Sequence, residues 1–491
     1  MSRPADGAPL RLLVIGAGEA GQSLVRELQA GGWPVAPVGF LDDDPALRGQ
    51  SPCGLPVLGA TVDLPAAAAR VGAQEILIAI PSATGAVIRR LVLLCRRAGL
   101  PVRIVPGIRA IIEGDVRFDQ VRPVAPDDLL GRESVTFRAD GARALVAGRR
   151  VLVTGAGGSI GGELCRQLLP FAPAELLLLG RGENSLFEIA AELEPRRGEV
   201  VLGTLICDVR DGERLDVLAG RHHVDLILHA AAHKHVPLME ENPEEAVAVN
   251  VLGTANLIRF ARRAGAERLV LVSTDKAAIP ASIMGATKRV AEELVRAAGA
   301  AGGPTRFLTV RFGNVLGSRG SVVPLFQDRI RRGLPLPVTD RAMTRYFMTI
   351  REAAQLVIEA MALGESGATY ILEMGEPVSI LELARNLLAL SGFDPDGGDG
   401  GPGIVITGAR PGERLTEELI ARDETLAPGA NPLIRRAVTA RPVLADPEAV
   451  VASLLRPARA GDPAGVRQAL ARLPGLAAVA AGFPAPEVSR P

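Results

Sequence analysis

Short runs of apolar residues recur along the chain, and most of them end in a glycine-rich or polar turn followed by a segment with helical periodicity. Continuous apolar runs of this length are typical of strands that are buried on both faces of a parallel sheet. In the first region, strands are predicted at residues 10–15, 38–42, 75–80 and 102–105, and helices at residues 22–30 and 86–98.

The second region repeats this alternation over a longer stretch. Strands are predicted at residues 150–154, 176–180, 226–232 and 268–272, and helices at residues 163–169 and 284–300. Strands that alternate with helices favour α/β domains built on parallel sheets. We therefore expect two Rossmann-like, doubly wound domains, the second with a small C-terminal substrate-binding part.

The domain boundaries follow from these elements. We expect a nucleotide-binding domain at residues 1–110, a connector packed on the second domain at 111–148, a catalytic domain at 149–440 and a C-terminal segment at 441–491. The last segment is rich in Ala, Pro and Arg, and prolines such as Pro463 and Pro474 discourage long helices. It is expected to be peripheral, with a frayed end.

The first predicted strand runs into a glycine turn that contains Gly16, Gly18 and Gly21. Backbone amides at the start of the following helix could bind a phosphate, and the acidic residues 42–44 end the next strand where a ribose hydroxyl could be held. The alternative is that these glycines only permit tight packing. The sequence leaves the ligand of this domain open.

A second glycine turn follows the strand at 150–154 and has the spacing G-x-x-G-x-x-G. Its position between a buried strand and a helix makes it the stronger of the two turns, and it predicts binding of a dinucleotide pyrophosphate. The residues expected to bind the cofactor here are Gly155, Gly158, Ser159, Ile160 and Gly161.

Residues after the later strands fit the rest of a dinucleotide. Asp208 and Val209 follow the third strand of this domain, where a carboxylate can meet the adenine edge. Ala230 and Ala231 are small enough to let a flat ring lie on the backbone, and Asn250 on the next helix can brace the active-site strand.

The end of the second strand lacks the carboxylate that usually binds the ribose diol of NAD. Arg181 stands there and could tolerate a 2′-phosphate, whereas Glu183 could supply the missing carboxylate. NAD is the preferred cofactor, and NADP is the alternative.

The stretch at residues 271–288 contains several side chains that can take part in catalysis, close together in the sequence. Thr274, Asp275 and Lys276 end a buried strand, where ligands of α/β proteins bind, and Lys288 on the next helix points the same way. Short-chain dehydrogenases place Tyr four residues before this Lys, but here the position holds Met284. A thioether cannot move a proton at neutral pH. Either the domain is inactive, or the proton chemistry has moved to residues 274–276.

Composition limits the possible partners. The chain has 491 residues, with 55 Lys and Arg against 55 Asp and Glu, so its formal net charge is zero. This balance gives no electrostatic reason to expect nucleic acid or an anionic membrane as a partner. No apolar stretch approaches the length of a membrane span. Small anionic ligands bound in pockets are the expected partners.

The four cysteines, Cys53, Cys95, Cys165 and Cys207, lack metal-binding spacing and predict reduced thiols and a cytoplasmic protein. The histidines at 222–223 and 233–235 have no third ligand cluster, so we expect no metal site.

Arginines on glycine-rich loops follow the catalytic stretch. Because a guanidinium can bind two phosphate oxygens at once, these loops predict a lid over the nucleotide half of a substrate. They lie at residues 311–315, 317–321, 343–348 and 408–414.

These motifs resemble those of the long bacterial UDP-N-acetylglucosamine 4,6-dehydratases of capsule, O-antigen and glycan biosynthesis, which are extended short-chain dehydrogenase/reductases. The resemblance covers roughly residues 10–435 and includes Met in place of Tyr, which argues against an inactive domain. The matching motifs are VLVTGAGGSIG (151–161), HAAAHKHVPLME (229–240), STDKA (273–277), MGATK (284–288), RFGNVLGSRGS (311–321) and RPGE (410–413).

The resemblance implies an NAD-dependent hydro-lyase that forms a UDP-4-keto-6-deoxy sugar. Asp275 is then the acid for the departing C6 hydroxyl, Lys276 the base for the C5 proton, and Thr274 polarises the C4 hydroxyl, while Lys288 holds the nicotinamide ribose. Substrate contacts are expected at Lys234, Asn314, Ser318, Arg319, Arg345, Arg410 and Glu413.

Two other functions remain open. A nucleotide-sugar epimerase shares the oxidation at C4 but needs no acid at C6, and a nucleotide-sensing or scaffolding protein would bind without turnover. The resemblance also implies a homo-oligomer, with the helix of Met284 as a possible interface. Relatives often carry membrane-spanning helices ahead of the first domain; this sequence starts almost at that domain, so we do not expect membrane attachment unless the sequence is a shortened form.

Overall fold

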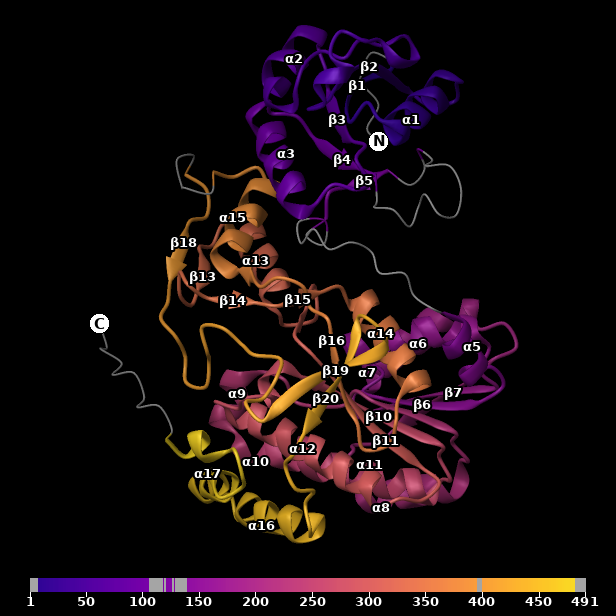
Figure 1. Cartoon of the computed structure of the whole chain (residues 1–491), viewed down its shortest axis with the longest axis vertical. Coiled ribbons are helices and arrows are strands. Elements are labelled where there is room, and N and C mark those ends of the chain that lie inside the picture. Colours follow the sequence, from indigo (N-terminus) through magenta and orange to yellow (C-terminus); the bar gives the residue numbers. More distant parts are fainter. Residues whose placement is uncertain are drawn as a thin grey trace. The chain divides into compact units, whose positions relative to one another are not determined.

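Parallel β-strands form the centre of each of the two units into which the chain divides (Figure 1). The computed structural model describes residues 8–105, 118, 121–125, 128, 139–394 and 400–481. The first unit comprises residues 1–135, 325–338 and 380–405, and the second comprises residues 136–324, 339–379 and 406–491. The prediction of two doubly wound α/β sheets is confirmed.

The first sheet has the strand order β2-β1-β3-β4-β5 and is parallel except for β5. Strand β1, which lies between β2 and β3, is almost fully buried from Leu12 to Ile15, which explains the continuous apolar run in the sequence. The elements are β1 (Leu10–Ile15), α1 (Glu19–Gln29), β2 (Val35–Leu41), α2 (Leu64–Val71), β3 (Glu75–Ile78), α3 (Gly85–Arg97), β4 (Val102–Ile104), β5 (Arg122–Pro123), β13 (Leu336–Val338), α15 (Ile380–Leu390) and β18 (Ile404–Ile406).

The first unit does not end near residue 110, where we expected its boundary. Strand β5 extends the first sheet beyond β4. Helix α15 packs against α3, and its Leu390 contacts the apolar cluster that includes Ile88 and Leu91 of α3. Segments that we assigned to the catalytic domain therefore belong to the first unit. Much of the predicted connector lies outside the described residues, but its end forms α5 (Ala139–Val146), which packs against α14 of the second unit.

The second sheet has the order β19-β20-β16-β11-β10-β9-β6-β7-β8. The seven strands from β16 to β8 are parallel, and an antiparallel hairpin extends one edge. Strands β6 and β9 are neighbours although two strands separate them in sequence. The chain direction across the sheet reverses between them, and such a switch point opens a ligand crevice at the carboxyl ends of the strands.

The strands of this sheet are β6 (Arg150–Thr154), β7 (Glu175–Gly180), β8 (Val201–Ile206), β9 (Leu226–His229), β10 (Arg268–Thr274), β11 (Arg306–Phe312), β16 (Thr369–Leu372), β19 (Glu424–Asn431) and β20 (Ile434–Thr439). Two short pairs, β12 (Asn314–Val315) with β15 (Phe347–Met348) and β14 (Thr344–Arg345) with β17 (Val378–Ser379), complete the strands of the unit.

Two helical layers cover the sheet. Helices α5, α6 and α14 pack on one another, and α8, α11 and α12 form the second layer. The helices are α6 (Ser159–Leu168), α7 (Glu183–Leu193), α8 (Gly212–Arg221), α9 (Val236–Glu241), α10 (Pro243–Ala246), the π-helical η8 (Val247–Leu252), α11 (Gly253–Arg263), α12 (Ile283–Ala300), α13 (Val322–Arg331, which crosses into the first unit) and α14 (Ile350–Leu363).

As far as residue 481, the C-terminal segment packs on this unit and is less peripheral than expected, whereas the predicted frayed end lies outside the described residues. The segment forms α16 (Pro447–Arg459) and α17 (Pro463–Ala471), which pack on α10, η8 and α12 (Figure 1). Pro463 does not break a helix because it stands in the first turn of α17, where no backbone N–H is needed. Leu454 and Leu470 are fully buried in the same apolar cluster as the catalytic helix. Residues beyond 481 lie outside the described part.

The cysteines are free, as expected. None of the helices in the described part of the chain combines the length and the hydrophobicity that a bilayer crossing requires.

A buried histidine joins three elements at the switch point. His229 ends β9, and its ring nitrogens lie 2.7 Å from Thr154 Oγ1 on β6 and 3.3 Å from Thr254 Oγ1 on α11. Burial, the larger effect, and the charge of Lys288 together lower the pKa of His229 to about 3. The ring is therefore neutral in the folded protein at physiological pH.

Substituting Leu454→Ala should destabilise the second unit by about 2–5 kcal/mol, because it opens a cavity in the core. The control Val443→Ala alters a side chain that is 41% exposed and should change stability by less than about 0.5 kcal/mol. Urea unfolding followed by circular dichroism measures both. Equal stability of the two variants would show that α16 does not belong to the core.

His229 should make the protein less stable in mild acid. Its folded pKa of about 3 is below its unfolded value of about 6.5, so this contribution is complete above pH 6.5 and is lost as the pH falls towards 3. At pH 5 the loss is about 2 kcal/mol. Urea unfolding at pH 7.5 and pH 5 should show a smaller acid loss for His229→Gln than for the wild type, and an equal loss would refute this explanation.

Candidate active site

The stretch at residues 271–288 forms the end of β10, the single turn η9 (Asp275–Ala277) and the start of α12. Strand β10 pairs with β9 and β11, so its carboxyl end lies within the sheet and not at an edge. The turn follows because the hydroxyl of Thr274 accepts the amide of Lys276 at 3.4 Å, and α12 begins because Ser282 accepts the amide of Gly285 at 3.0 Å.

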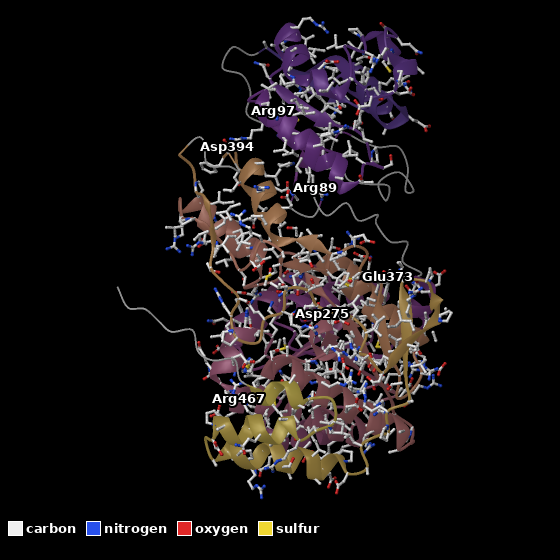
Figure 2. The ribbon with its side chains drawn as sticks, turned by 60° about the vertical axis from the view of Figure 1, so that its left-hand side comes forward. Arg89, Arg97, Asp275, Glu373, Asp394 and Arg467 are labelled. Carbon is white, nitrogen blue, oxygen red and sulfur yellow. The ribbon has the colours of Figure 1, made fainter. Side chains whose placement is uncertain are left out.

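Thr274, Asp275 and Lys276 form one hydrogen-bonded group, as the sequence predicts. Asp275 is 1% exposed, and its Oδ1 accepts from Thr274 Oγ1 at 2.9 Å and from Lys276 Nζ at 2.8 Å (Figure 2 marks its position). Its other oxygen, Oδ2, is buried and has no hydrogen-bond partner in the described residues. A buried carboxylate oxygen without a partner is costly, so this geometry is suited to receive a hydroxyl group of a ligand.

Two further groups lie near the amine of Lys276. Asn314 Oδ1 accepts from it at 3.2 Å, so a residue predicted to bind substrate contacts a residue predicted to be catalytic. Glu417 Oε1 lies 4.0 Å away. Glu417 is not among the predicted site residues, because two adjacent glutamates such as Glu417 and Glu418 are usually both exposed to solvent.

Met284 and Lys288 are buried, as Asp275 is. Met284 is 2% exposed and packs in the apolar cluster of the second layer. Lys288 Nζ donates to the carbonyl of Val272 at 2.8 Å, and burial lowers its pKa to about 8, although Glu292 opposes this shift. The expected role of α12 as an interface is not supported, because most of this helix is buried within its own unit.

The second glycine turn has the close backbone approach that a pyrophosphate site needs. Gly155 has φ +68°, and a Cβ there would lie 2.8 Å from the amide nitrogen of Ala231. A Cβ at Gly161 would lie 2.1 Å from the carbonyl oxygen of Gly155. Gly158 precedes α6, which begins with Ser159 and Ile160. The residues present thus fit a dinucleotide at the switch point, with Ala230 and Ala231 on the opposite side.

The expected adenosine-side residues are less uniform. Asp208 accepts from Arg210 at 2.8 Å, and Arg181 lies 3.9 Å from the same carboxylate. Arg181 and Glu183 are exposed, so both remain accessible to a ribose. Val209 is buried in the core, and its carbonyl accepts from Asn256, which makes it mainly a structural residue.

Asn250 braces a loop and not the active-site strand, contrary to our expectation. Its side chain donates to the carbonyl of His233 at 3.1 Å and accepts from the amide of His233 at 2.8 Å. It also donates to Thr287 Oγ1 at 3.1 Å. Asn250 therefore fixes the loop after β9 to the catalytic helix.

The loop at residues 317–321 contacts the glycine turn. The amide of Arg319 donates to Ser159 Oγ at 3.0 Å, and Lys234 Nζ donates to Ser318 Oγ at 3.4 Å. Burial lowers the pKa of Lys234. Three residues predicted to bind substrate are therefore brought to the edge of the predicted cofactor site.

The remaining predicted substrate residues come from two segments. Arg345 is buried and donates from NH1 to the carbonyls of Thr344 and Leu415 at 2.7 and 3.0 Å. Arg410 is exposed, and its amide lies 3.3 Å from Glu413 Oε2, which closes a tight turn.

Arg311 has no role in ligand binding in this structure, although its loop suggested one. It is 1% exposed and donates to Glu292 at 2.6 Å and to Glu424 at 2.7 Å. Ser273 on β10 also donates to Glu292 at 2.6 Å. Burial alone would raise the pKa of Glu424, but the hydrogen bond and charge of Arg311 lower it to about 2.

The C-terminal helices also support the site. Arg467 on α17 (Figure 2) donates to Glu240 Oε2 at 2.7 Å, and Glu240 Oε1 accepts the amide of Ile283 at the start of α12. A Cβ at Gly412 would lie 2.9 Å from the same oxygen of Glu240. One carboxylate therefore connects α17, the catalytic helix and the turn of the RPGE motif.

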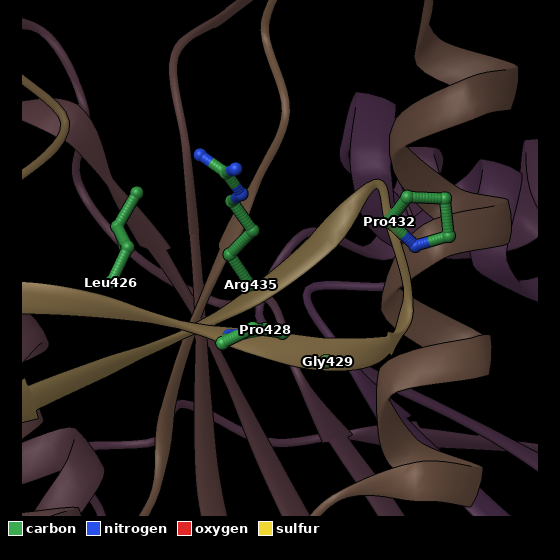
Figure 3. Close-up of a pocket in the computed structure, with 5 residues that line it drawn as sticks. All are labelled: Leu426, Pro428, Gly429, Pro432 and Arg435. Carbon is green, nitrogen blue, oxygen red and sulfur yellow. The ribbon is translucent and has the colours of Figure 1, made fainter.

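A hollow of about 320 Å³ lies on the β19–β20 hairpin (Figure 3). It contains none of the predicted site residues, so we do not assign the chemistry to it. Its lining comprises Leu426, Pro428, Gly429, Pro432 and Arg435. The described residues contain no cluster of three or more His, Cys, Asp or Glu side chains that could hold a metal ion.

Two family models match the chain. Residues 151–438 match a model described as a polysaccharide biosynthesis protein, and residues 8–106 match a CoA-binding domain. At the glycine turn of the first unit, however, Asp42 Oδ2 accepts the amide of Ala17 at 2.7 Å. This bond engages one backbone amide of the turn, whereas the start of α1 has no side-chain cap, so both explanations of the turn stand.

Relatives match over most of the catalytic region. The probable polysaccharide biosynthesis protein EpsC of Bacillus subtilis is 46% identical over 422 residues, which span 86% of this chain and 70% of that protein. The UDP-N-acetylglucosamine 4,6-dehydratase (inverting) of Campylobacter jejuni is 34% identical over 284 residues, 57% of this chain and 79% of that protein. A UDP-glucose 4-epimerase of Rickettsia rickettsii is 31% identical over 283 residues, 56% and 79% of the two chains.

Among solved structures, Pen from Bacillus thuringiensis is 34% identical with a TM-score of 0.55, covering 60% of this chain and 89% of that one. The family model matches more than half of the chain. The chain belongs to the polysaccharide biosynthesis protein family of extended short-chain dehydrogenase/reductases.

Proposed function

We propose that the chain is a nucleotide-sugar 4,6-dehydratase that converts UDP-N-acetylglucosamine, or a similar UDP-hexose, to a UDP-4-keto-6-deoxy sugar. The observation that carries this proposal is Asp275, a buried carboxylate bound on one oxygen by Thr274 and Lys276 and left without a partner on the other. The similarity to the Campylobacter jejuni dehydratase supports the same reaction class.

NAD is the proposed cofactor, held by the glycine turn at Gly155–Gly161, by Ala230 and Ala231, and by Lys288. When bound, NAD+ supplies the hydride chemistry, since it accepts hydride from C4 of the sugar and returns it to C6. NADP remains the alternative, because Arg181 stands at the end of β7 where a 2′-phosphate would lie.

The first proton comes from the C4 hydroxyl of the sugar. Thr274 lies between this hydroxyl and Asp275 in the proposed complex, and it already donates to Asp275 Oδ1. A proton lost from the C4 hydroxyl during oxidation can therefore pass through Thr274 to Asp275. This transfer loads the carboxyl group that must later act as an acid.

The second proton comes from C5, which becomes acidic only when C4 is a ketone. Lys276 takes this proton, and Asp275 gives its own proton to the departing C6 hydroxyl, which leaves as water. Lys276 then returns a proton to C5. The proton from the C4 hydroxyl leaves in the water molecule, and the proton taken from C5 is replaced at C5. Thr274, Asp275 and Lys276 therefore end each cycle in the protonation states in which they began.

The main alternative function is that of a nucleotide-sugar 4-epimerase, and the similarity to the Rickettsia enzyme supports this alternative. An epimerase has no use for an acid at C6, so the buried Asp275 beside Lys276 favours the dehydratase. A sensing or scaffolding protein would have no use for this buried acid and base pair at the end of β10.

Substituting Lys276→Ala should abolish formation of a sugar nucleotide lighter by one water, while the cofactor stays bound. Lys276→Arg is the matched control for charge, because it keeps the cation but cannot act as a base. Mass spectrometry of the product and release of the cofactor on denaturation measure the two properties. Full turnover by Lys276→Ala would refute the assignment of the base.

A further inference from the structure

Glu417 is buried, although its position beside Glu418 predicts that it is exposed to solvent. Leu415, two residues earlier in the same irregular segment, is 45% exposed, whereas Glu417 is 5% exposed. The next residue, Glu418, is exposed and pairs with Arg414 at 3.2 Å. Burying a carboxylate while an apolar neighbour stays exposed is unfavourable for folding. A function of Glu417 in the site therefore explains its burial better than a contribution to stability does.

Two basic residues predicted to belong to the site lie within 4.0 Å of Glu417. Its Oε1 lies 4.0 Å from Lys276 Nζ and 3.9 Å from Arg345 NH2. Both distances are too long for hydrogen bonds, so these contacts are electrostatic. Lys276 is held by Asp275 and Asn314, whereas Arg345 is held by backbone carbonyls.

A structural carboxylate in the same unit has a different environment. Glu424 accepts hydrogen bonds from Arg311 at 2.7 Å, from Arg289 at 3.1 Å and from the amide of Ala421 at 2.9 Å. These bonds compensate for its burial. Glu417 has only longer contacts to its cations, which is the arrangement of a group whose environment changes when a ligand binds.

The charge of Glu417 depends on all groups that face it. Burial, the largest effect, raises its pKa; the charge of Asp275 raises it further, and Lys276, Arg345 and Arg414 lower it. The net shift is upward, so the carboxyl group stays neutral to a higher pH than an ordinary glutamate.

We propose that Glu417 is a positioning residue for the proposed dehydration, on which this inference rests: its carboxylate orients Lys276 towards the sugar and at the same time opposes binding of the diphosphate at Arg345. When charged, it stabilises the ammonium group that forms on Lys276 as the amine takes the C5 proton. It also repels the phosphate oxygens that Arg345 is expected to bind. The residue thus reduces ground-state affinity and supports proton transfer.

The substitution Glu417→Gln separates these two effects. UDP should bind roughly three- to tenfold more tightly to this variant than to the wild type at pH 8.5, because one nearby negative charge is removed. The difference should shrink as the pH falls, because Glu417 then becomes neutral in the wild type as well; titration of UDP itself cancels in the ratio of the two Kd values. The turnover number kcat should fall at least tenfold. Calorimetry with UDP and product mass spectrometry measure the two effects.

Glu418→Gln is the matched control, because it removes the same charge from an exposed neighbour and should stay within about twofold of the wild type in both assays. Glu417→Asp should restore part of kcat. Equal UDP affinity of Glu417→Gln and Glu418→Gln at every pH, or weaker binding together with a lower Tm, would overturn the inference. A wild type that dehydrates no UDP-hexose would instead overturn the proposed function, and UDP binding would still decide whether Glu417 opposes the diphosphate.

Discussion

The active site depends on one buried guanidinium. Arg311 on β11 joins Glu292 of the catalytic helix, Glu424 at the start of β19 and the carbonyl of Leu419. Because Ser273 of β10 also bonds to Glu292, the strand, the helix and the returning segment are fixed to one another directly below the catalytic turn. A buried pair of this kind adds little net stability over apolar packing, but removing one partner leaves charges unpaired, so it enforces one arrangement strongly.

The network explains why two kinds of buried carboxylate occur in the same unit. Glu292 and Glu424 have hydrogen-bonded partners on both oxygens and hold elements in place. Among the residues that the structure describes, one oxygen of Asp275 has no hydrogen-bond partner, and Glu417 has only contacts near 4 Å. Incomplete pairing is costly in the protein alone and is useful where a substrate completes it. Asp275 and Glu417, the two carboxylates to which we assign a function, therefore differ from the structural carboxylates because their hydrogen bonding is incomplete.

Sequence patterns were sufficient for the sheets, for the glycine turn at Gly155 and for the cluster of Thr274, Asp275 and Lys276, because these features depend on local spacing and on strand ends. Long-range features were missed for physical reasons. Arg311 pairs with Glu424, and Glu417 lies near Lys276, in each case a partner more than a hundred residues away in the sequence. Helix α17 forms because Pro463 occupies its first turn and its apolar face meets α12. The division of residues 380–405 into the first unit likewise depends on packing that no local pattern encodes.

Deuterium labelling tests the central claim most directly. The intact protein is incubated with UDP-N-acetylglucosamine in deuterated water, and the sugar is followed by NMR. If Lys276 exchanges the C5 proton while Asp275 expels the C6 hydroxyl, the product is a 4-keto-6-deoxy sugar that carries deuterium at C5, and the configuration at C5 shows whether the reaction inverts that centre. A sugar that keeps all its oxygen atoms and changes only its configuration at C4 would contradict the account and identify an epimerase.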